Sequence, residues 1–210
     1  MIERPHGGLS IVLVDGQSSG RGAKIVSNIV ARKAISLLGE GVRDGAAARA
    51  AHDYLRTHRS GRVSAELQII SVDLASRTLV VSRNAHCPAF VVRGIEVQTL
   101  DAESESIGIR VSTKPVIVEL PIEAETYVVA ASDGLLEAGI RHGRTLAVPT
   151  LLATLAARRL SAQGLADALL DAALAADDYR PGDDVSVVVA AVLPEDVPHG
   201  ARRFTVSFPV

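Results

Sequence analysis

Apolar residues recur along this chain with two periods, which predict where its helices and strands lie. Residues 23–38 carry a single apolar stripe at helical spacing, which indicates a helix with one buried face. Asp44 is expected to be the N-cap of a second helix that continues to Arg59. Two more helices are expected at residues 151–158 and 161–176.

Alternation with a period of two, together with short apolar runs, predicts the strands. One hairpin is expected where residues 65–72 turn back into residues 78–82. A second is expected where residues 89–93 meet residues 95–100 across Gly94. The remaining expected strands are residues 9–14, 115–120, 127–131, 185–192 and 203–208.

The order of these elements indicates the fold class. Strands come in antiparallel groups with helices in pairs between them, and not in strict alternation of strand and helix. This order favours the α+β class and a four-layer α-β-β-α sandwich, in which helix pairs flank an antiparallel β-sandwich. No internal linker precedes residue 193, so one domain is expected over residues 1–193. Residues 194–210 are expected to form a linker and an extra C-terminal strand packed on the same domain.

Composition and charge narrow the classes of function. Hydrophobic residues make up 48% of the 210 residues and charged residues 22%, as in ordinary globular proteins. The net charge is −2 with both signs interspersed, which gives no electrostatic argument for a nucleic acid or membrane partner. Cys87 is the single cysteine, and no apolar run approaches the roughly 20 residues that span a membrane. These features, with no signal-peptide layout at the N-terminus, predict a cytoplasmic protein.

Three aspartate turns stand at the ends of predicted strands and suggest chemistry. A glycine beside an aspartate allows a sharp bend and holds the carboxylate rigidly. Strand ends that are far apart in sequence can meet at one edge of a folded sheet, where gathered carboxylates would bind a hard cation. Taken alone, Asp15 and Asp133 are better explained as ordinary turn residues, and Asp183-Asp184 could cap the loop after Pro181-Gly182. The three are Asp15-Gly16, Asp133-Gly134 and Asp183-Asp184.

Four signatures in a fixed order connect these turns to a known family. They are Val14-Asp15-Gly16 with Gly20 and Ala23 ahead of a helix, Asn84-Ala85-His86-Cys87-Pro88, Ser132-Asp133-Gly134-Leu135-Leu136-Glu137, and Asp183-Asp184-Val185-Ser186. Over about residues 9–192 the chain resembles the metal-dependent PPM (type 2C) serine/threonine phosphatases. Within that family it is most similar to the compact bacterial branch, the stage II sporulation protein E-like phosphatases and stress-response sigma-factor regulators.

The resemblance implies a site with two Mg²⁺ or Mn²⁺ ions at one edge of the sandwich. It implies that Asp15 bridges the two ions and that the carbonyl of Gly16 binds one of them. Asp133 and Asp183 are the later ligands it implies, with Asp184 supporting Asp183. Asp15 and Asp133 are therefore also the expected catalytic residues.

The resemblance further implies a reaction and a substrate. A metal-activated water attacks phosphorus in line, so no protein nucleophile is required. The expected function is hydrolysis of phosphoserine or phosphothreonine on a phosphorylated regulatory protein of bacteria. An anti-sigma-factor antagonist or a stressosome component is the expected partner.

Two departures from the family pattern leave other functions open. Relatives carry a further metal-binding aspartate in a Gly-Asp segment before the first Asp-Gly, whereas none of the 14 residues before Asp15 is an aspartate. Gln17-Ser18 stands where this branch has an apolar residue and a glycine. The alternatives are a catalytically weak or inactive phosphatase fold that binds a phosphoprotein or regulator, and a small-molecule phosphatase.

The histidines and the cysteine carry weaker signals. His86 could serve as a general acid, but its loop is expected to be structural. Cys87 is expected to be a small buried residue and not a reactive thiol. The other histidines show no metal-ligand spacing and are expected to face solvent: His6, His52, His58, His142 and His199.

Overall fold

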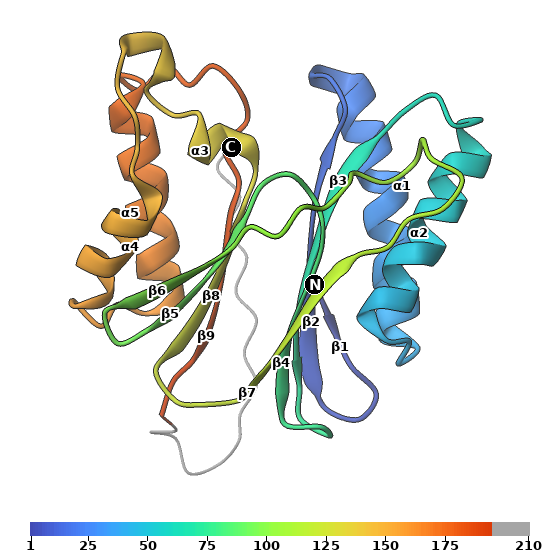
Figure 1. Ribbon diagram of the computed structural model, residues 1–210, viewed down its shortest axis with the longest axis horizontal. Helices are drawn as coiled ribbons and strands as arrows, with labels where there is room; N and C mark the ends of the chain where they lie inside the picture. Colours follow the sequence, from blue (N-terminus) through green and yellow to red (C-terminus); the bar gives the residue numbers. More distant parts are fainter. Residues whose placement is uncertain (195–210) are drawn as a thin grey trace, which may run out of the picture.

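A computed structural model describes residues 1–194, and its antiparallel β-sandwich lies between two pairs of helices (Figure 1). The predicted α+β class and the four-layer α-β-β-α order are confirmed. The strand expected at residues 203–208 lies outside the described residues, and so does the expected linker apart from its first residue.

The first sheet is antiparallel throughout. Its strands, in spatial order, are β1 (Ile2–Glu3), β2 (Gly8–Gly16), β3 (Ala65–Asp73), β4 (Thr78–Asn84) and β7 (Val116–Pro121). Strand β2 pairs with β3 along its whole length, from Gly8 opposite Asp73 to Gly16 opposite Ala65. This long pairing fixes the register of both strands up to the end where β2 stops.

The second sheet faces the first and is also antiparallel. Its strands, in spatial order, are β6 (Glu96–Leu100), β5 (Ala89–Arg93), β8 (Thr126–Ala131) and β9 (Val187–Val192). Every residue of β8 is buried, because a sheet lies on one side of it and helices on the other. This explains why its sequence reads as an unbroken apolar run, without polar alternation.

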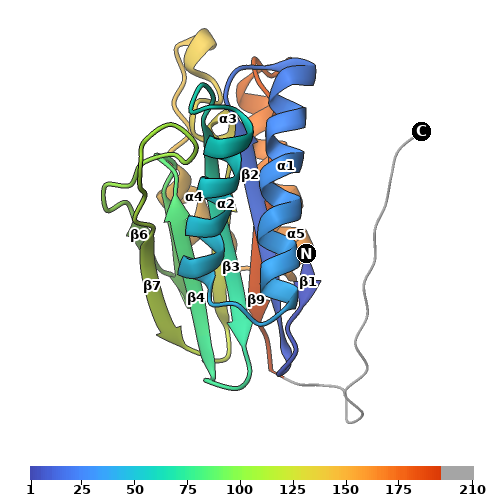
Figure 2. The same ribbon diagram turned by 90° about the vertical axis from the view of Figure 1, so that its right-hand side faces the viewer.

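Helices cover both outer faces of the sandwich (Figures 1 and 2). On the first sheet lie α1 (Gly20–Gly39) and α2 (Asp44–His58), and on the second lie α4 (Val148–Ala156) and α5 (Ala162–Ala176). A one-turn helix, α3 (Asp133–Leu136), and a 3-10 turn, η1 (Ile140–His142), connect β8 to α4. No helix within residues 1–194 is long and apolar enough to cross a membrane.

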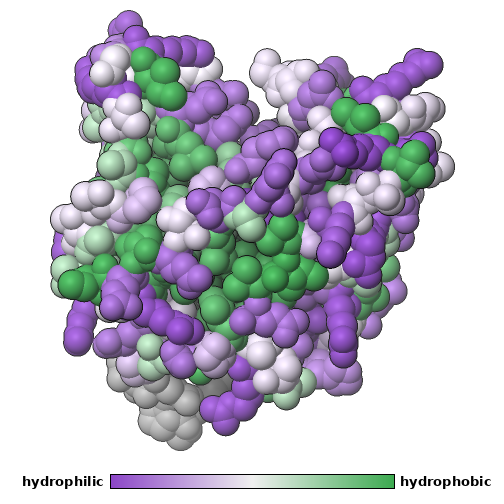
Figure 3. All heavy atoms as spheres, in the orientation of Figure 1, coloured by the Kyte–Doolittle hydropathy of each residue, from purple (hydrophilic) through white to green (hydrophobic). Residues whose placement is uncertain are grey.

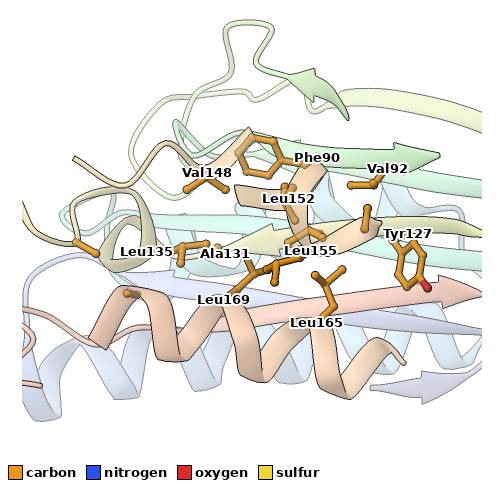
Figure 4. Close-up of a cluster of buried hydrophobic side chains, with 14 residues drawn as sticks. Phe90, Val92, Tyr127, Ala131, Leu135, Val148, Leu152, Leu155, Leu165 and Leu169 are labelled. Atoms are coloured by element: carbon orange, nitrogen blue, oxygen red, sulfur yellow. The ribbon is translucent and has the colours of Figure 1, made fainter. Parts of the chain in front are cut away.

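Three apolar layers hold the four structural layers together. One lies between α1, α2 and the first sheet, and one lies between the two sheets. The third lies between the second sheet, α4 and α5, and includes Phe90, Leu152 and Leu169 (Figure 4). Full burial of one such side chain stabilises the fold by about 1.5–3 kcal/mol. These layers fix the spacing of the two sheets, and so the positions of the loops at their ends.

Two helices begin earlier than the sequence predicts, and one short strand was not predicted. Helix α1 begins at Gly20 and not at residue 23, because its exposed first turn carries no apolar signal. Helix α4 begins at Val148 and not at residue 151, since Pro149 fits the first turn of a helix. The two-residue strand β1 was not predicted, because so short a segment has no period to detect.

The prediction for Asp44 is wrong. The N-cap of α2 is Arg43, and no side chain caps this helix end. The carboxylate of Asp44 turns inward, where it accepts a hydrogen bond from the hydroxyl of Ser71 and lies 3.3 Å from Nη1 of Arg4. The same guanidinium donates to the hydroxyl of Ser10 at 3.1 Å. These four buried polar residues join the N-terminal segment, α2 and the first sheet.

The prediction that His52 faces solvent is also wrong. Its exposed fraction is 1%, because it lies on the face of α2 that packs against the sheet and the following loops. Its Nδ1 accepts a hydrogen bond of 3.1 Å from the backbone N–H of Gly108. A histidine on an inner helix face thus holds the loop between β6 and β7.

Breaking the buried polar cluster should destabilise the fold strongly. Asp44→Ala is expected to lower the free energy of unfolding by about 3–5 kcal/mol, because Arg4 would keep a buried charge without its partner. Chemical denaturation measures the change. Asp53→Ala, at an exposed position of the same helix, should cost less than about 0.5 kcal/mol. Equal effects of the two variants would contradict a structural role for the cluster.

Candidate metal centre

Four acidic side chains line one cavity of about 490 Å³ at the end of the sandwich where β2 stops. They come from β2, β3, α3 and the loop before β9, and they are Asp15, Glu66, Asp133 and Asp183. Gly16 lines the same cavity. This end lies at the top of Figure 1, and the surface is hollowed there between the two halves (Figure 3). The structure therefore brings together the three aspartate turns that the sequence singled out.

The pairing of β2 with β3 positions the first turn. Asp15 lies opposite Glu66, and Gly16 lies opposite Ala65. A Cβ at Gly16 would lie 2.4 Å from the carbonyl oxygen of Ala23 in α1, a distance that no side chain tolerates. Gly16 therefore allows α1 to pack directly against the end of the strand that carries Asp15.

The Gln17-Ser18 departure has a visible structural consequence. The backbone N–H of Gln17 donates to the carbonyl of Ser64 at 3.0 Å, and its Oε1 accepts from the N–H of Ser64 at 3.0 Å. Ser18 has a φ of 73°, in the left-handed region that favours glycine. A glycine would suit this backbone, and serine adopts it with some strain. Gln17 meanwhile ties the loop to the start of β3.

Backbone and hydroxyl hydrogen bonds join the second turn to the third. The backbone N–H of Ser132 donates to the carbonyl of Ser186 at 3.0 Å, and its Oγ accepts from the N–H of Ser186 at 3.0 Å. The same hydroxyl donates to the carbonyl of Asp184 at 3.1 Å. A Cβ at Gly134 would lie 2.6 Å from that carbonyl oxygen, so only glycine allows α3 to come this close. The Ser-Asp-Gly motif thus fixes Asp133 beside the Asp-Asp turn.

Two more hydrogen bonds hold the third turn, one within the turn itself and one from η1. The backbone N–H of Asp184 donates to Oδ1 of Asp183 at 2.8 Å. Arg141 is the middle residue of η1, and its Nη2 donates to the carbonyl of Gly182 at 3.1 Å. Asp184 lines a neighbouring hollow and not the main cavity. Asp184 therefore contacts Asp183 through its backbone.

Burial, together with the crowding of negative charge, raises the pKa of two aspartates. Burial raises the pKa of Asp15 from 3.8 to about 6, with further contributions from Asp133, Glu66, Asp183 and Asp184. Burial also raises the pKa of Asp133, helped by the charges of Asp183 and Glu66. Repulsion of this kind favours any cation that enters the cavity.

Glu66 is the site residue that the sequence analysis missed. Its Oε1 accepts a hydrogen bond from the backbone N–H of His86 at 3.0 Å and lies 2.6 Å from Nδ1 of the same histidine. The available signal was its place in β3, where it alternates with Ala65 and Leu67 and shares a face with Gln68. An acidic residue on the inner face of a buried strand needs a partner, and that requirement could have identified it.

A buried arginine, Arg83, holds the loop that carries His86 through hydrogen bonds to its backbone. The guanidinium of Arg83 donates to the carbonyls of Ala85 and Cys87, at 3.1 and 2.8 Å, and to the carbonyl of Ala102. Cys87 is buried, and burial followed by the charge of Glu66 raises the pKa of its thiol. The prediction that Cys87 is a small buried residue is confirmed, and a protonated buried thiol is a poor nucleophile.

The cavity suits a hydrated divalent cation. Within residues 1–194, no three His, Cys, Asp or Glu side chains already lie close enough together to enclose an ion. Mg²⁺ keeps several water ligands and needs few protein ones, so carboxylates spaced around an open cavity fit it. Carboxylate and carbonyl oxygens also match Mg²⁺ and Mn²⁺ better than metals that prefer sulfur or nitrogen. The raised pKa of Asp15 is the sign that positive charge would be favoured here.

Comparisons with known proteins agree with this geometry. The profile of the stage II sporulation protein E family matches residues 5–193. The stage II sporulation protein E of Priestia megaterium is 22% identical over 190 residues, which are 90% of this chain and 32% of that protein. This chain therefore spans about a third of the length of that relative.

Two solved structures share the fold. The SiaA-PP2C domain of Pseudomonas aeruginosa has a TM-score of 0.74 at 21% identity, over 89% of this chain and 76% of that one. The catalytic domain of the serine threonine protein phosphatase PstP, solved in complex with two manganese ions, has a TM-score of 0.66 at 17% identity, over 88% of each chain. Because the family profile covers nearly all of the described residues, the chain belongs to the stage II sporulation protein E family and has the PP2C phosphatase fold.

Proposed function

We propose that this chain is a metal-dependent phosphatase that hydrolyses phosphoserine or phosphothreonine in a regulatory protein. The observation that carries the proposal is the single cavity in which Asp15, Asp133 and Asp183 meet. Membership of the family supports phosphate-ester chemistry, and the two manganese ions of the PstP domain support the choice of metal.

Four residues of the cavity have a proposed role in binding metal. Asp15 would hold the metal ions, with the carbonyl of Gly16 and the carboxylates of Asp133 and Asp183 as the other protein ligands. The backbone N–H of Asp184 keeps the carboxylate of Asp183 in place. When bound, Mn²⁺ or Mg²⁺ supplies a water of lowered pKa and positive charge for the phosphoryl oxygens.

The rest of the cavity suits water as the nucleophile. The buried Cys87, with its raised thiol pKa, is poorly placed to attack phosphorus. The cavity is open to solvent and hydrophilic along one side, where Gln17, Ser18 and Ser19 line it. A phosphorylated side chain that projects from a protein can enter such an opening. By family, an anti-sigma-factor antagonist or a stressosome component in the bacterial cytoplasm is the proposed partner.

One observation favours a second candidate, a weak or inactive phosphatase fold that binds a phosphoprotein. In the described chain, β1 pairs with β2 only opposite Leu9 and Ser10, far from Asp15. The outer edge of β2 beside Asp15 is where a preceding strand could bring one more carboxylate. An ion held by fewer carboxylates would bind more weakly, and turnover would fall with its occupancy.

Hydrolysis of p-nitrophenyl phosphate and of a phosphoserine peptide tests the proposal. We expect both reactions to require Mn²⁺ and to stop when the metal is chelated. Asp133→Asn should lower kcat by at least about 100-fold, since even residues that only support a metal ligand are worth 10- to 100-fold. Asp171→Asn, at an exposed position of α5, is the matched control and should leave kcat unchanged.

The outcomes separate the candidates. No hydrolysis by the native chain, combined with retention of a phosphorylated partner on it, would overturn the phosphatase proposal in favour of the binding module. Hydrolysis of small phosphate esters with no activity on phosphopeptides would point to a small-molecule phosphatase.

The charge on Asp15 should make the metal-free protein less stable as the pH rises. The folded chain binds the Asp15 proton more tightly than the unfolded chain, because the pKa is about 6 in the fold and 3.8 without it. Between these two values ionisation increasingly opposes folding, and above pH 6 the loss is complete. Asp15→Asn should therefore raise the melting temperature of the metal-free protein above pH 6 and have little effect below pH 3.8.

Adding Mn²⁺ should reverse this order. The native chain gains stability from an ion that binds only the folded state, whereas Asp15→Asn should gain much less. Titration calorimetry of both proteins measures the affinity directly. Equal Mn²⁺ binding by the two proteins would remove Asp15 from the ligand set.

A further inference from the structure

A histidine–carboxylate pair lies in the same cavity as the aspartates, and the proposed metal site does not use it. Oε1 of Glu66 lies 2.6 Å from Nδ1 of His86. The side chain of Glu66 is 24% exposed and that of His86 is 74% exposed. Both line the cavity together with Asp15 and Asp133. The carboxylate is thus mostly enclosed at the base of the pair, while the imidazole is largely exposed to solvent.

The contact with Glu66 determines which nitrogen of His86 is available. An ionised carboxylate can only accept hydrogen bonds, so Nδ1 carries its hydrogen toward Glu66. The backbone N–H of His86 donates to the same oxygen at 3.0 Å, which fixes the carboxylate against the loop. Nε2 has no protein partner among the described hydrogen bonds and is the atom left to face a substrate.

The loop does not need the imidazole to keep its shape. Arg83 already binds the carbonyls on both sides of His86, those of Ala85 and Cys87. The side-chain amide of Asn84 donates to the carbonyl of Glu105 at 3.1 Å and to the hydroxyl of Thr113 at 2.8 Å. These contacts come from buried residues at the end of β4. The ring is therefore supported by the loop, whereas the loop is supported by other residues.

We propose that His86 is the general acid of the reaction and that Glu66 is the positioning residue that orients it. This inference rests on the phosphatase function proposed above. As the attacking water forms its bond to phosphorus and loses a proton to solvent, the bond from phosphorus to the seryl or threonyl oxygen breaks, and its electron pair stays on that oxygen. The oxygen takes the proton from Nε2 of His86, and the neutral imidazole regains a proton from solvent. Nδ1 of His86 keeps its hydrogen throughout and donates it to Oε1 of Glu66.

The leaving group gives the sharpest test. A serine or threonine alkoxide is strongly basic and needs a proton to leave, whereas p-nitrophenolate is weakly basic and leaves without one. The test measures kcat on both substrates at saturating Mn²⁺, for the native full chain and for His86→Asn. Asparagine can still donate to Glu66 from its amide, so it keeps the contact and removes the acid.

We expect His86→Asn to lower kcat on the phosphoserine peptide about 100-fold, the lower end of what a general acid contributes. The loss of kcat on p-nitrophenyl phosphate should be much smaller. In His86→Ala, added imidazole should restore part of the phosphopeptide rate. The matched control is His142→Asn. Nδ1 of His142 lies 3.4 Å from Oδ2 of Asp178, and this histidine does not line the cavity. This variant should change neither rate.

Glu66→Gln distinguishes orientation from metal binding. A positioning role predicts a lower kcat on the phosphopeptide with KM and the Mn²⁺ affinity nearly unchanged. A tenfold or larger loss of Mn²⁺ affinity by calorimetry would instead make Glu66 a metal ligand and would overturn the assignment. Nitrogen-15 NMR of the metal-free protein adds a readout without turnover. The neutral His86 ring should carry its hydrogen on Nδ1, and a hydrogen on Nε2 would contradict the proposal.

The two levels of the proposal fail in different ways. If the native chain hydrolyses neither substrate with Mn²⁺, the phosphatase function and the general acid are both overturned. If the native chain is active and His86→Asn slows both substrates equally, or slows neither, the phosphatase function stands and His86 is not the acid.

Discussion

Repulsion among carboxylates is the constraint on which the end of this sandwich depends. Asp15, Glu66, Asp133 and Asp183 line one cavity, where burial and then the charges of the neighbouring carboxylates raise the pKa of Asp15 to about 6. On mobile loops these side chains would move apart. Here they are held by the pairing of β2 with β3 and by the hydrogen bonds of Ser132 to the turn before β9. The fold therefore keeps an electrostatically unfavourable arrangement, which a bound cation would make favourable.

Each sheet contributes two of the four acidic residues of this cavity. Asp15 and Glu66 come from the first sheet, and Asp133 and Asp183 flank strands of the second. Their separation depends on the apolar layer between the sheets, where Ile70, Val91 and other buried side chains pack. Packed sheets lie about 10 Å apart face to face, which leaves room for hydrated ions between their ends. The apolar layer between the sheets, which does not line the cavity, thus sets the width of the candidate metal site.

Buried polar residues hold the loops around the cavity. Arg83 is 2% exposed and binds three carbonyls of two loops, one of which carries His86. His52 holds the loop after β6 through Gly108. A buried cation or imidazole with several backbone partners can fix an irregular segment that has no ladder hydrogen bonds of its own. The loops after β4 and β6, which have no regular secondary structure, are therefore anchored by buried side chains.

Sequence alone determined the larger part of this protein. The two periods gave the helices and strands, because apolar residues must face a core whatever the neighbours are. The Asp-Gly and Asp-Asp turns could be recognised as candidate ligands, because a strand end followed by glycine is a local feature. Asp15, Gly16, Asp133 and Asp183 were all found in this way, and all four line the cavity.

Only the tertiary structure decided which polar residues meet. Asp44 looks like a helix cap, yet its carboxylate binds Arg4 and Ser71, which are distant in sequence. His52 looks exposed on a helix, and Glu66 looks like one more polar residue of a strand, until β3 is placed beside β2 and the loop of His86. The local sequence pattern shows which side chains are apolar and must be buried. The environment of a polar side chain depends instead on which partner the packed layers bring within hydrogen-bond distance.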